Sequence, residues 1–326
     1  MASNKRLIAA GPIASGGNTA DLAIVPYTGT GSTFTVTTDL EFSPDLIWVK
    51  NLGQAEGGMF DPKTLSFYGL ETHGTSGQFA FSYFTANSNG FDVNSSGGRH
   101  NASGIDFIAY CFNAGGSPVT NTDGSVNTQV AANTNLGFSI VTCASSNTGN
   151  TLGHGLGTAP QIVIARNYGT GGNWSVNSNV FGSYGSHKLM FNNDLDRRND
   201  SNEITAVSST TFTVGGSGAT TGANIIYFCF TEISGISKFG TFTGNGTNLS
   251  VTGFGFMPRL LIIKRYDSTG NWVVVDSERS NYEHYINLTQ AQSLETNIPT
   301  LDSDGFTVNN GRYNNNGASF FYMAFA

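Results

Sequence analysis

The sequence predicts an all-β protein of three related antiparallel β-sandwich (jelly-roll-like) modules in tandem, after a short N-terminal arm. Glycine accounts for 42 of the 326 residues and aromatic residues for 12%. Charged residues are only 11% of the chain, against about 25% in an ordinary soluble domain. Disordered chains carry few aromatic residues, and helical chains need runs of strong helix formers. Short Phe/Val/Ile/Thr runs between Gly/Asn/Ser clusters instead predict strands and turns.

An internal repeat predicts the three modules. In each copy a proline opens an apolar run and a basic residue closes it six positions later, at Pro44–Lys50, Pro160–Arg166 and Pro258–Lys264. Self-similarity at a fixed period is typical of repeated structural units. The copies place an arm at 1–20, module 1 at 21–116, module 2 at 117–235 and module 3 at 236–326.

The N-terminal arm differs from a signal peptide. Lys5 and Arg6 precede an apolar stretch, Leu7–Ala10, that breaks at Gly11. This stretch is shorter than the roughly 7–15 apolar residues of a secretory signal. Two interpretations stay open for the arm: a disordered tail, and a segment that threads into a neighbouring subunit.

The predicted strands are of two kinds. Residues 33–37 alternate polar and apolar side chains, which is typical of a strand with one buried face. Residues 46–49 and their equivalents are almost continuously apolar, which predicts a central strand covered on both faces. Residues 107–112 and their equivalents predict the strand that closes each module.

Charge and cysteine content exclude several classes of protein. The net charge is −7 and the pI is about 5.1, so we expect no nucleic-acid partner. No apolar run reaches the roughly 20 residues that span a bilayer, so we expect no membrane insertion. Cys111, Cys143 and Cys229 are too few and too far apart for a disulfide scaffold or a zinc site. Because the third copy has Ala324 where the others have Cys111 and Cys229, we interpret these thiols as buried and inert.

Residues that resemble catalytic or metal-binding groups have structural interpretations. Asp61, Asn177 and Asp276 occupy equivalent positions, and an amide cannot replace a general acid or base. We expect all three to accept backbone hydrogen bonds at turns. The acidic segment 194–200 departs from a calcium-binding loop at its fifth and sixth positions, which favours a solvated loop. We therefore predict no catalytic residue, no cofactor and no metal site.

One repeated feature predicts a binding surface. A tyrosine lies 24 residues after each module's proline, and a histidine follows within a few residues. An aromatic ring beside a neutral polar group can stack on a sugar, although a tyrosine that anchors a turn through its hydroxyl is the stronger alternative. The candidate glycan-contacting residues are Tyr68, Tyr184, His187, Tyr282 and His284, with His73 as the histidine of module 1.

Several strings of the sequence resemble a family of repeated β modules in virion structural and tail-fibre-type proteins of tailed phages, many of them marine. The resemblance covers residues 21–326 and weakens in module 2, where Ile164 replaces Trp48. It implies a particle component without catalysis, because its motifs are framework residues. The strings are 42–51, 101–115, 120–126, 153–160, 237–246 and 322–326.

Three functions follow as expectations. The resemblance favours a tail fibre or tail-associated adhesin on the virion, made in the host cytoplasm. A capsid decoration or head-fibre protein is the alternative. A polysaccharide depolymerase ranks third, since such enzymes have solenoid repeats of about 20–30 residues and a carboxylate pair. The expected partners are the protein itself, as a homo-oligomer with a trimer favoured, other virion proteins, and a host surface glycan or receptor.

Overall fold

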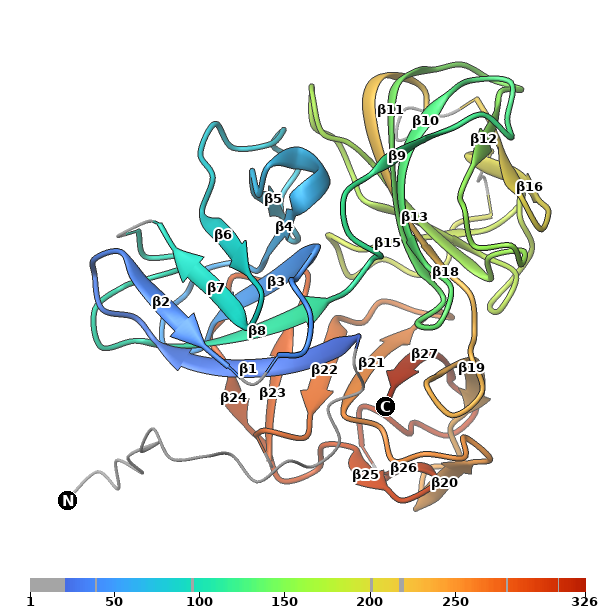
Figure 1. Ribbon diagram of the computed structural model, residues 1–326. Coiled ribbons are helices and arrows are strands. Elements are labelled where there is room, and N and C mark those ends of the chain that lie inside the picture. The colour runs from blue at the N-terminus through green and yellow to red at the C-terminus, as the bar shows by residue number, and fades with distance from the viewer. Residues whose placement is uncertain are drawn as a thin grey trace.

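The computed structural model describes residues 21–38, 40–94, 97–199, 202–216, 220–279, 281–309 and 311–326. Its regular structure is almost entirely antiparallel β-sheet, gathered into three units around a common centre (Figure 1). The predicted all-β fold of antiparallel, sandwich-like units is confirmed. The predicted arm, residues 1–20, lies outside the described residues.

Module 1 is a sandwich of a five-stranded and a three-stranded sheet. The strand orders are β1-β8-β3-β4-β5 and β2-β7-β6. A single 3₁₀ turn, η1 (Lys63–Leu65), follows β4. The strands are β1 (Leu22–Thr28), β2 (Phe34–Thr37), β3 (Leu46–Asn51), β4 (Met59–Pro62), β5 (Leu70–Glu71), β6 (Phe84–Asn87), β7 (Gly90–Val93) and β8 (Asp106–Phe112).

Module 2 repeats this plan and adds a hairpin, β9–β10, at one edge. Its strand orders are β15-β14-β13-β18-β11-β10-β9 and β12-β17-β16. The strands are β9 (Val119–Asn121), β10 (Thr128–Asn133), β11 (Phe138–Ser146), β12 (Thr151–Gly153), β13 (Ile162–Asn167), β14 (Ser175–Ser178), β15 (Lys188–Met190), β16 (Ile204–Val207), β17 (Thr211–Val214) and β18 (Gly222–Phe230).

Module 3 has the same arrangement with one extra edge strand, β24. Its strand orders are β19-β27-β21-β22-β23-β24 and β20-β26-β25. The strands are β19 (Ser237–Thr243), β20 (Leu249–Thr252), β21 (Leu260–Arg265), β22 (Trp272–Asp276), β23 (Tyr282–Tyr285), β24 (Ser293–Leu294), β25 (Thr300–Asp302), β26 (Gly305–Val308) and β27 (Ser319–Phe325).

The large sheet of each module is covered on both faces. All six residues of β3 are buried. Because successive side chains of a strand point to opposite faces, Ile47 and Val49 pack in the core of module 1, whereas Leu46 and Trp48 pack in a second core. The prediction of central strands covered on both sides is confirmed for β3 and for its equivalent in module 2, β13.

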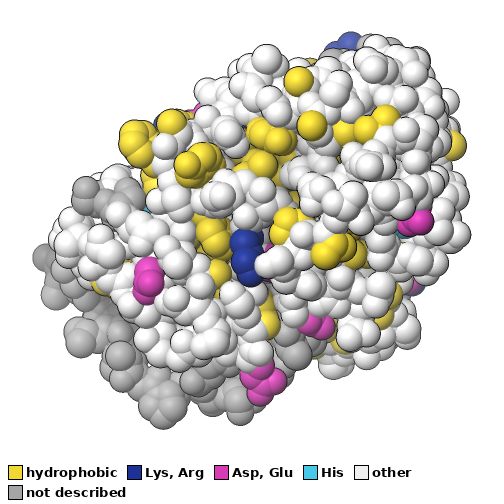
Figure 2. All heavy atoms as spheres, turned by 45° about the horizontal axis from the view of Figure 1, so that its top comes forward, with side chains coloured by type: hydrophobic (Ala, Val, Ile, Leu, Met, Phe, Trp, Pro, Cys, Tyr) yellow, Lys and Arg dark blue, Asp and Glu magenta, His cyan; other side chains and the backbone are white. Residues whose placement is uncertain are grey.

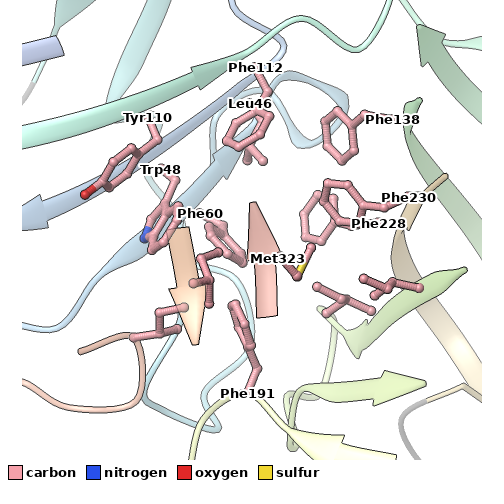
Figure 3. Packing of buried hydrophobic residues seen from close by; sticks show 14 of the residues in the cluster. Leu46, Trp48, Phe60, Tyr110, Phe112, Phe138, Phe191, Phe228, Phe230 and Met323 are labelled. Carbon is pink, nitrogen blue, oxygen red and sulfur yellow. The ribbon is translucent and has the colours of Figure 1, made fainter. Parts of the chain in front are cut away.

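The second core is shared by all three modules. Figure 3 shows side chains from the three large sheets pointing toward one another at the centre of the molecule, among them Phe60 from module 1, Phe228 from module 2 and Met323 from module 3. They enclose an apolar cavity of about 30 Å³. Tandem repeats alone do not predict this closure: the modules form a closed ring instead of a linear string.

Each module contributes one tryptophan to this core, but module 1 supplies it from a different strand. Trp174 immediately precedes β14 and Trp272 begins β22, the strands that follow the apolar runs. The equivalent residue of module 1 is Gly58, immediately before β4. The tryptophan of module 1 is instead Trp48, on β3. A Cβ atom at position 58 would lie 3.3 Å from Nε1 of Trp48. The glycine therefore leaves the space that the indole of Trp48 fills.

This pairing predicts strong coupling between positions 48 and 58. Trp48→Ile alone leaves a cavity and Gly58→Trp alone overfills the core, so each should lower the free energy of unfolding by about 2–3 kcal/mol. The double variant W48I/G58W recreates the arrangement of modules 2 and 3 and should recover most of this loss. Urea unfolding of the four proteins measures the coupling, and additive losses in the double variant would contradict the pairing.

Candidate functional site

The basic residues that close the three apolar runs join the modules to one another. Lys50, Arg166 and Lys264 have no exposed surface. Nζ of Lys50 donates to the carbonyl of Leu288 in module 3 (3.2 Å), and Nζ of Lys264 to that of Asp194 in module 2 (3.1 Å). Nη1 of Arg166 donates to the carbonyl of Glu71 in module 1 (2.6 Å). Each module therefore holds the segment that follows β5, β15 or β23 of another module, which for β5 begins at its last residue, Glu71.

Backbone hydrogen bonds repeat the same pattern at all three contacts. Each is an amide of the loop that donates to the carbonyl two residues after the basic residue. The pairs are Gln78 to Tyr168 (2.8 Å), Arg197 to Tyr266 (2.8 Å) and Gln292 to Leu52 (3.2 Å). Because the third pair joins module 3 back to module 1, the contacts form a closed ring. We call the three contacts the seams.

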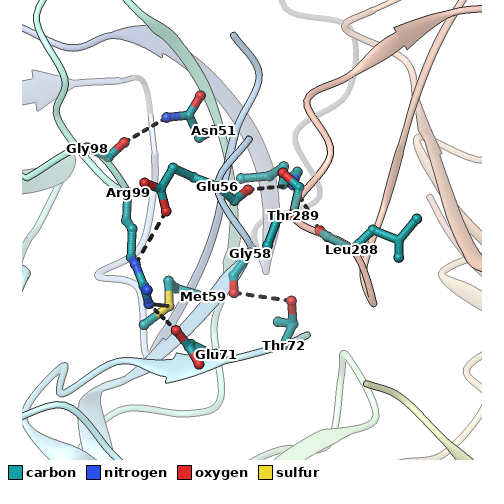
Figure 4. A network of polar contacts seen from close by, with 11 residues as sticks. Asn51, Glu56, Gly58, Met59, Glu71, Thr72, Gly98, Arg99, Leu288 and Thr289 are labelled. Carbon is teal, nitrogen blue, oxygen red and sulfur yellow. Dashed lines mark hydrogen bonds and ion pairs between the residues drawn. The ribbon is translucent and has the colours of Figure 1, made fainter. Parts of the chain in front are cut away.

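Polar contacts within module 1 and across to module 3 meet at the seam between these two modules (Figure 4). Nζ of Lys50 also donates to the carbonyl of Glu56 (2.6 Å), and Oγ1 of Thr72 donates to that of Ile286 (2.7 Å). Arg99 pairs with Glu71 and lies 3.4 Å from the Glu56 carboxylate. Burial lowers the pKa of Lys50 to about 7, and the Arg279 charge acts in the same direction while Glu56 opposes it.

A second buried network crosses the same two modules. The hydroxyl of Tyr110 in module 1 donates to Oδ2 of Asp276 in module 3 (2.8 Å) and lies 2.9 Å from Nε2 of His284. Nε of Arg279 donates to the same carboxylate oxygen (3.0 Å). Burial lowers the pKa of His284 well below its usual value, and Arg279 and Lys50 add to the effect. The neutral imidazole and the Asp276–Arg279 pair thus bind one module to the other.

The candidate glycan-contacting residues differ in their burial and in their hydrogen bonds. His284 is fully buried, so it offers no surface to a sugar, and its place in that hypothesis is corrected. The hydroxyl of Tyr184 donates to the carbonyl of Pro160 (2.9 Å), which is the turn-anchoring role given as the alternative. His187 is partly buried and its Nδ1 accepts from the amide of Ser183 (3.1 Å).

Tyr68 and Tyr282 keep a place at the surface. Both are partly exposed. Tyr68 forms an isolated β-bridge with Ser82 in the loop after β5, and Tyr282 pairs with Leu294 of β24. His73 has the same intermediate burial and lies against Gly57.

Strand pairing gives Tyr68 and Tyr282 one structural position, which His187 occupies in module 2, whereas Tyr184 lies three residues before it. The equal spacing therefore identifies a shared position in two modules only.

The aligned residues Asp61, Asn177 and Asp276 lie within strands β4, β14 and β22, not at turns. Oδ2 of Asp61 lies 3.4 Å from Nε2 of buried His100. Asn177 donates to Oγ of Ser175. Strand pairing sets Asp61 opposite Ile47 and Asn177 opposite Val163, but Asp276 opposite Leu260, one residue out of step. All three are buried, but the expectation that they occupy one equivalent position at a turn is wrong.

The cysteines and the acidic segment have structural places. The predicted burial of Cys111, Cys143 and Cys229 is confirmed, all three are free, and burial raises the pKa of Cys229 to about 12. Segment 194–200 supplies the Asp194 carbonyl to a seam. Within the described ranges no three His, Cys, Asp or Glu residues cluster as metal ligands. No helix in those ranges is long and apolar enough to cross a membrane.

The molecular surface is mostly uncharged. Figure 2 shows one face on which hydrophobic side chains gather in several groups and charged side chains are sparse. The large apolar side chains with at least half of their surface exposed are Phe81, Val119, Met257 and Leu294. Contiguous apolar patches mark contact surfaces, whereas single exposed apolar side chains are ordinary on protein surfaces.

Burial of Lys50 predicts a dependence of stability on pH. Its pKa is about 7 in the native protein and near 10.5 in the unfolded chain. Between these values the unfolded chain binds the extra proton, so the free energy of unfolding should rise from pH 7 toward pH 9.5. Lys264, with a pKa of about 8, contributes in the same direction.

Urea unfolding across this range measures the slope. Lys50→Met should flatten it, whereas Lys238→Met, which removes a partly exposed lysine paired with Glu232, should leave it unchanged. Equal slopes in the wild type and in Lys50→Met would refute the role of Lys50.

Comparison with known proteins assigns a family to the chain. No curated protein matches the sequence. Residues 22–326 match the family described as "Domain of unknown function (DUF7483)". This match covers the shared core, the core of each module, the three seams and the loops that they hold. The chain therefore belongs to that family.

Proposed function

We propose that this protein is a non-enzymatic structural component of a phage virion, and that it serves as a tail fibre or tail-associated adhesin that contacts the host surface. The observation that carries the proposal is that the buried lysine and arginine side chains form hydrogen bonds between modules. Lys50, Arg166 and Lys264 all bind carbonyl groups of another module. Burial of a charged side chain is unfavourable, and these buried side chains connect the three modules into one rigid unit.

The motifs behind the phage resemblance support this role. The string 42–51 contains β3 and Lys50, and the string 101–115 contains β8. Both strands contribute to the shared core. The resemblance therefore rests on the framework that closes the ring, which is the part a family of particle proteins would share.

Exposed apolar side chains support contact with other molecules. Phe81 and Leu294 are each 67% exposed on loops that the seams hold in place. A preformed surface of this kind loses little conformational freedom on binding. The partners that we propose are further copies of the chain, other virion proteins and a host surface glycan or receptor, and a trimer remains our preferred oligomer.

The second candidate is a capsid decoration or head-fibre protein that stabilises the shell. The closed ring favours it as much as it favours an adhesin, because a rigid block also suits a protein that rests on a shell. The exposed apolar residues would then contact the capsid.

The position of the protein on the particle tests the proposal. Gold-labelled antibody against residues 21–326, viewed by electron microscopy on particles from the source phage, should label the tail or its fibres. Label over the whole shell would identify a decoration protein. Absence of label from intact particles, with label present on disrupted particles as a control for antibody access, would place the protein inside the particle and refute both roles. Absence of label from both would refute a virion role.

A further inference from the structure

Arg99, which lies between β7 and β8, packs against the loop between β5 and β6 in module 1 and is partly exposed. The guanidinium carbon of Arg99 lies 5.0 Å from the centre of the Phe79 ring. The same guanidinium pairs with the carboxylates of Glu71 and Glu56. One third of the Arg99 side chain stays exposed. An arginine that is fixed in this way keeps donors free for a ligand in a defined plane.

Aromatic side chains are concentrated in the same loop. Phe79, Phe81 and Tyr83 lie within five residues, and the rings of Phe79 and Tyr83 are in contact, with centroids 6.3 Å apart. Phe79 and Tyr83 are partly exposed, whereas Phe81 is 67% exposed. Arg99 covers one face of Phe79 and the Tyr83 ring stacks on His100, so the exposed ring of this loop is that of Phe81.

This loop is held in place from several sides. The amide of Gln78 donates to the carbonyl of Tyr168 at the seam (2.8 Å), and that of Phe79 to the carbonyl of Gly69 (2.9 Å). Ser82 forms a β-bridge with Tyr68. A ligand would meet a preorganised surface and would not need to order the loop.

Module 3 carries a related arrangement. Arg312 and Arg99 lie equally far, five residues, before the closing glycine of their modules, Gly317 and Gly104. Arg312 lies over the ring of Tyr313 at 5.0 Å and pairs with Glu283 and Glu295.

The partners in module 3 come from different positions than those in module 1. Glu295 adjoins the exposed Leu294, which is the β-bridge partner of Tyr282. In both modules an arginine thus pairs with two carboxylates, and an exposed apolar side chain lies in the sequence within two residues of one of the arginine's contacts, Phe79 or Glu295.

The chemistry of the site selects its ligand. The aromatic rings offer flat apolar surface to the C–H face of a pyranose. Guanidinium donors and carboxylate acceptors together match sugar hydroxyls, which both donate and accept. Two carboxylates against one guanidinium leave a formal negative charge, which disfavours sialic or uronic acids.

We propose that the surface formed by Phe79, Phe81, Tyr83 and Arg99 binds a neutral hexose unit of a glycan, and that the surface around Leu294 and Arg312 is a weaker second copy. The inference deepens the proposed adhesin function and rests on it. Leucine lacks a flat ring, so the second surface contributes less.

Binding of methyl glycosides to the full chain tests the proposal. The probes are methyl glucoside, galactoside, mannoside and N-acetylglucosaminide, with N-acetylneuraminic acid as the anionic comparison, on a biosensor that carries the protein. At least one neutral probe should bind with a Kd of about 1 mM, as expected for a single small contact. Phe81→Ala should weaken binding by about tenfold, equivalent to roughly 1.4 kcal/mol.

Matched variants separate stacking from general effects. Phe81→Tyr keeps the ring and should retain binding. Val119→Ala removes a side chain of similar exposure, 66%, from module 2, and should change nothing. Leu294→Ala should have a smaller effect than Phe81→Ala. All these side chains are exposed, so the melting temperature of each variant should match that of the wild type.

Three results would overturn the inference. These are absence of binding by every neutral probe at 50-fold above about 1 mM, wild-type affinity in Phe81→Ala, or tighter binding of the anionic probe. Particle labelling is independent of this assay. A tail-located protein without sugar binding would refute the sugar site alone, and absence of the protein from particles would refute the proposed function.

Discussion

The two apolar faces of each large sheet impose the constraint on which the rest of the structure depends. The small sheet of a module covers only one of these faces. A module alone would expose the other, which carries side chains such as Trp48, Phe228 and Met323. Because exposed apolar area of this extent is unfavourable, the three modules close around one core, and no module is expected to be stable by itself.

Closure of the ring places backbone groups in the interior, and the buried cations follow from that. The segments that follow β5, β15 and β23 enter the seams, where their carbonyl groups face protein instead of water. A buried carbonyl without a hydrogen-bond donor is unfavourable. Lysine and arginine supply several donors from one side chain. Their desolvation is itself unfavourable, as the lowered pKa values of Lys50 and Lys264 indicate. At the seams the desolvation cost of the cations therefore replaces the cost of unpaired carbonyl groups, and the hydrogen bonds fix the alignment of one module with the next.

Much of the fold follows from the sequence because it depends on local patterns. Alternation, apolar runs and glycine-rich turns predict strands and sandwiches, and the repeat predicts three related units. The shared core is harder to predict, since an apolar run shows that both faces of a strand are covered but not what covers them. The basic residue after each run is visible in the sequence, yet its partner lies in another module, such as Leu288 for Lys50.

The candidate site residues are likewise only partly predictable from the sequence. Equal spacing finds the position shared by Tyr68 and Tyr282 but misplaces it in module 2, where strand pairing puts His187 there. Burial of a neighbouring histidine also depends on contacts between modules. His284 faces Tyr110 of another module and is buried for that reason. Arg99 and Arg312 could be found from their equal distance to the closing glycines. Their carboxylate partners could not, because those lie 17 to 43 positions away in the sequence.

The segments that follow β5 in module 1 and β23 in module 3 both contribute to a seam and present side chains at the surface. In module 1 the first part of the loop, up to Gln78, docks at a seam, and the part from Phe79 to Tyr83 reaches the surface. In module 3 Gln292 contacts Leu52, and Leu294 is exposed two residues later. The core and the seams restrict change at framework positions, so the outer parts of these loops are where modules can differ without loss of the ring. A surface that varies while its supports stay fixed is suited to recognition, and this is why we place binding there and not at Tyr184, whose hydroxyl anchors a turn.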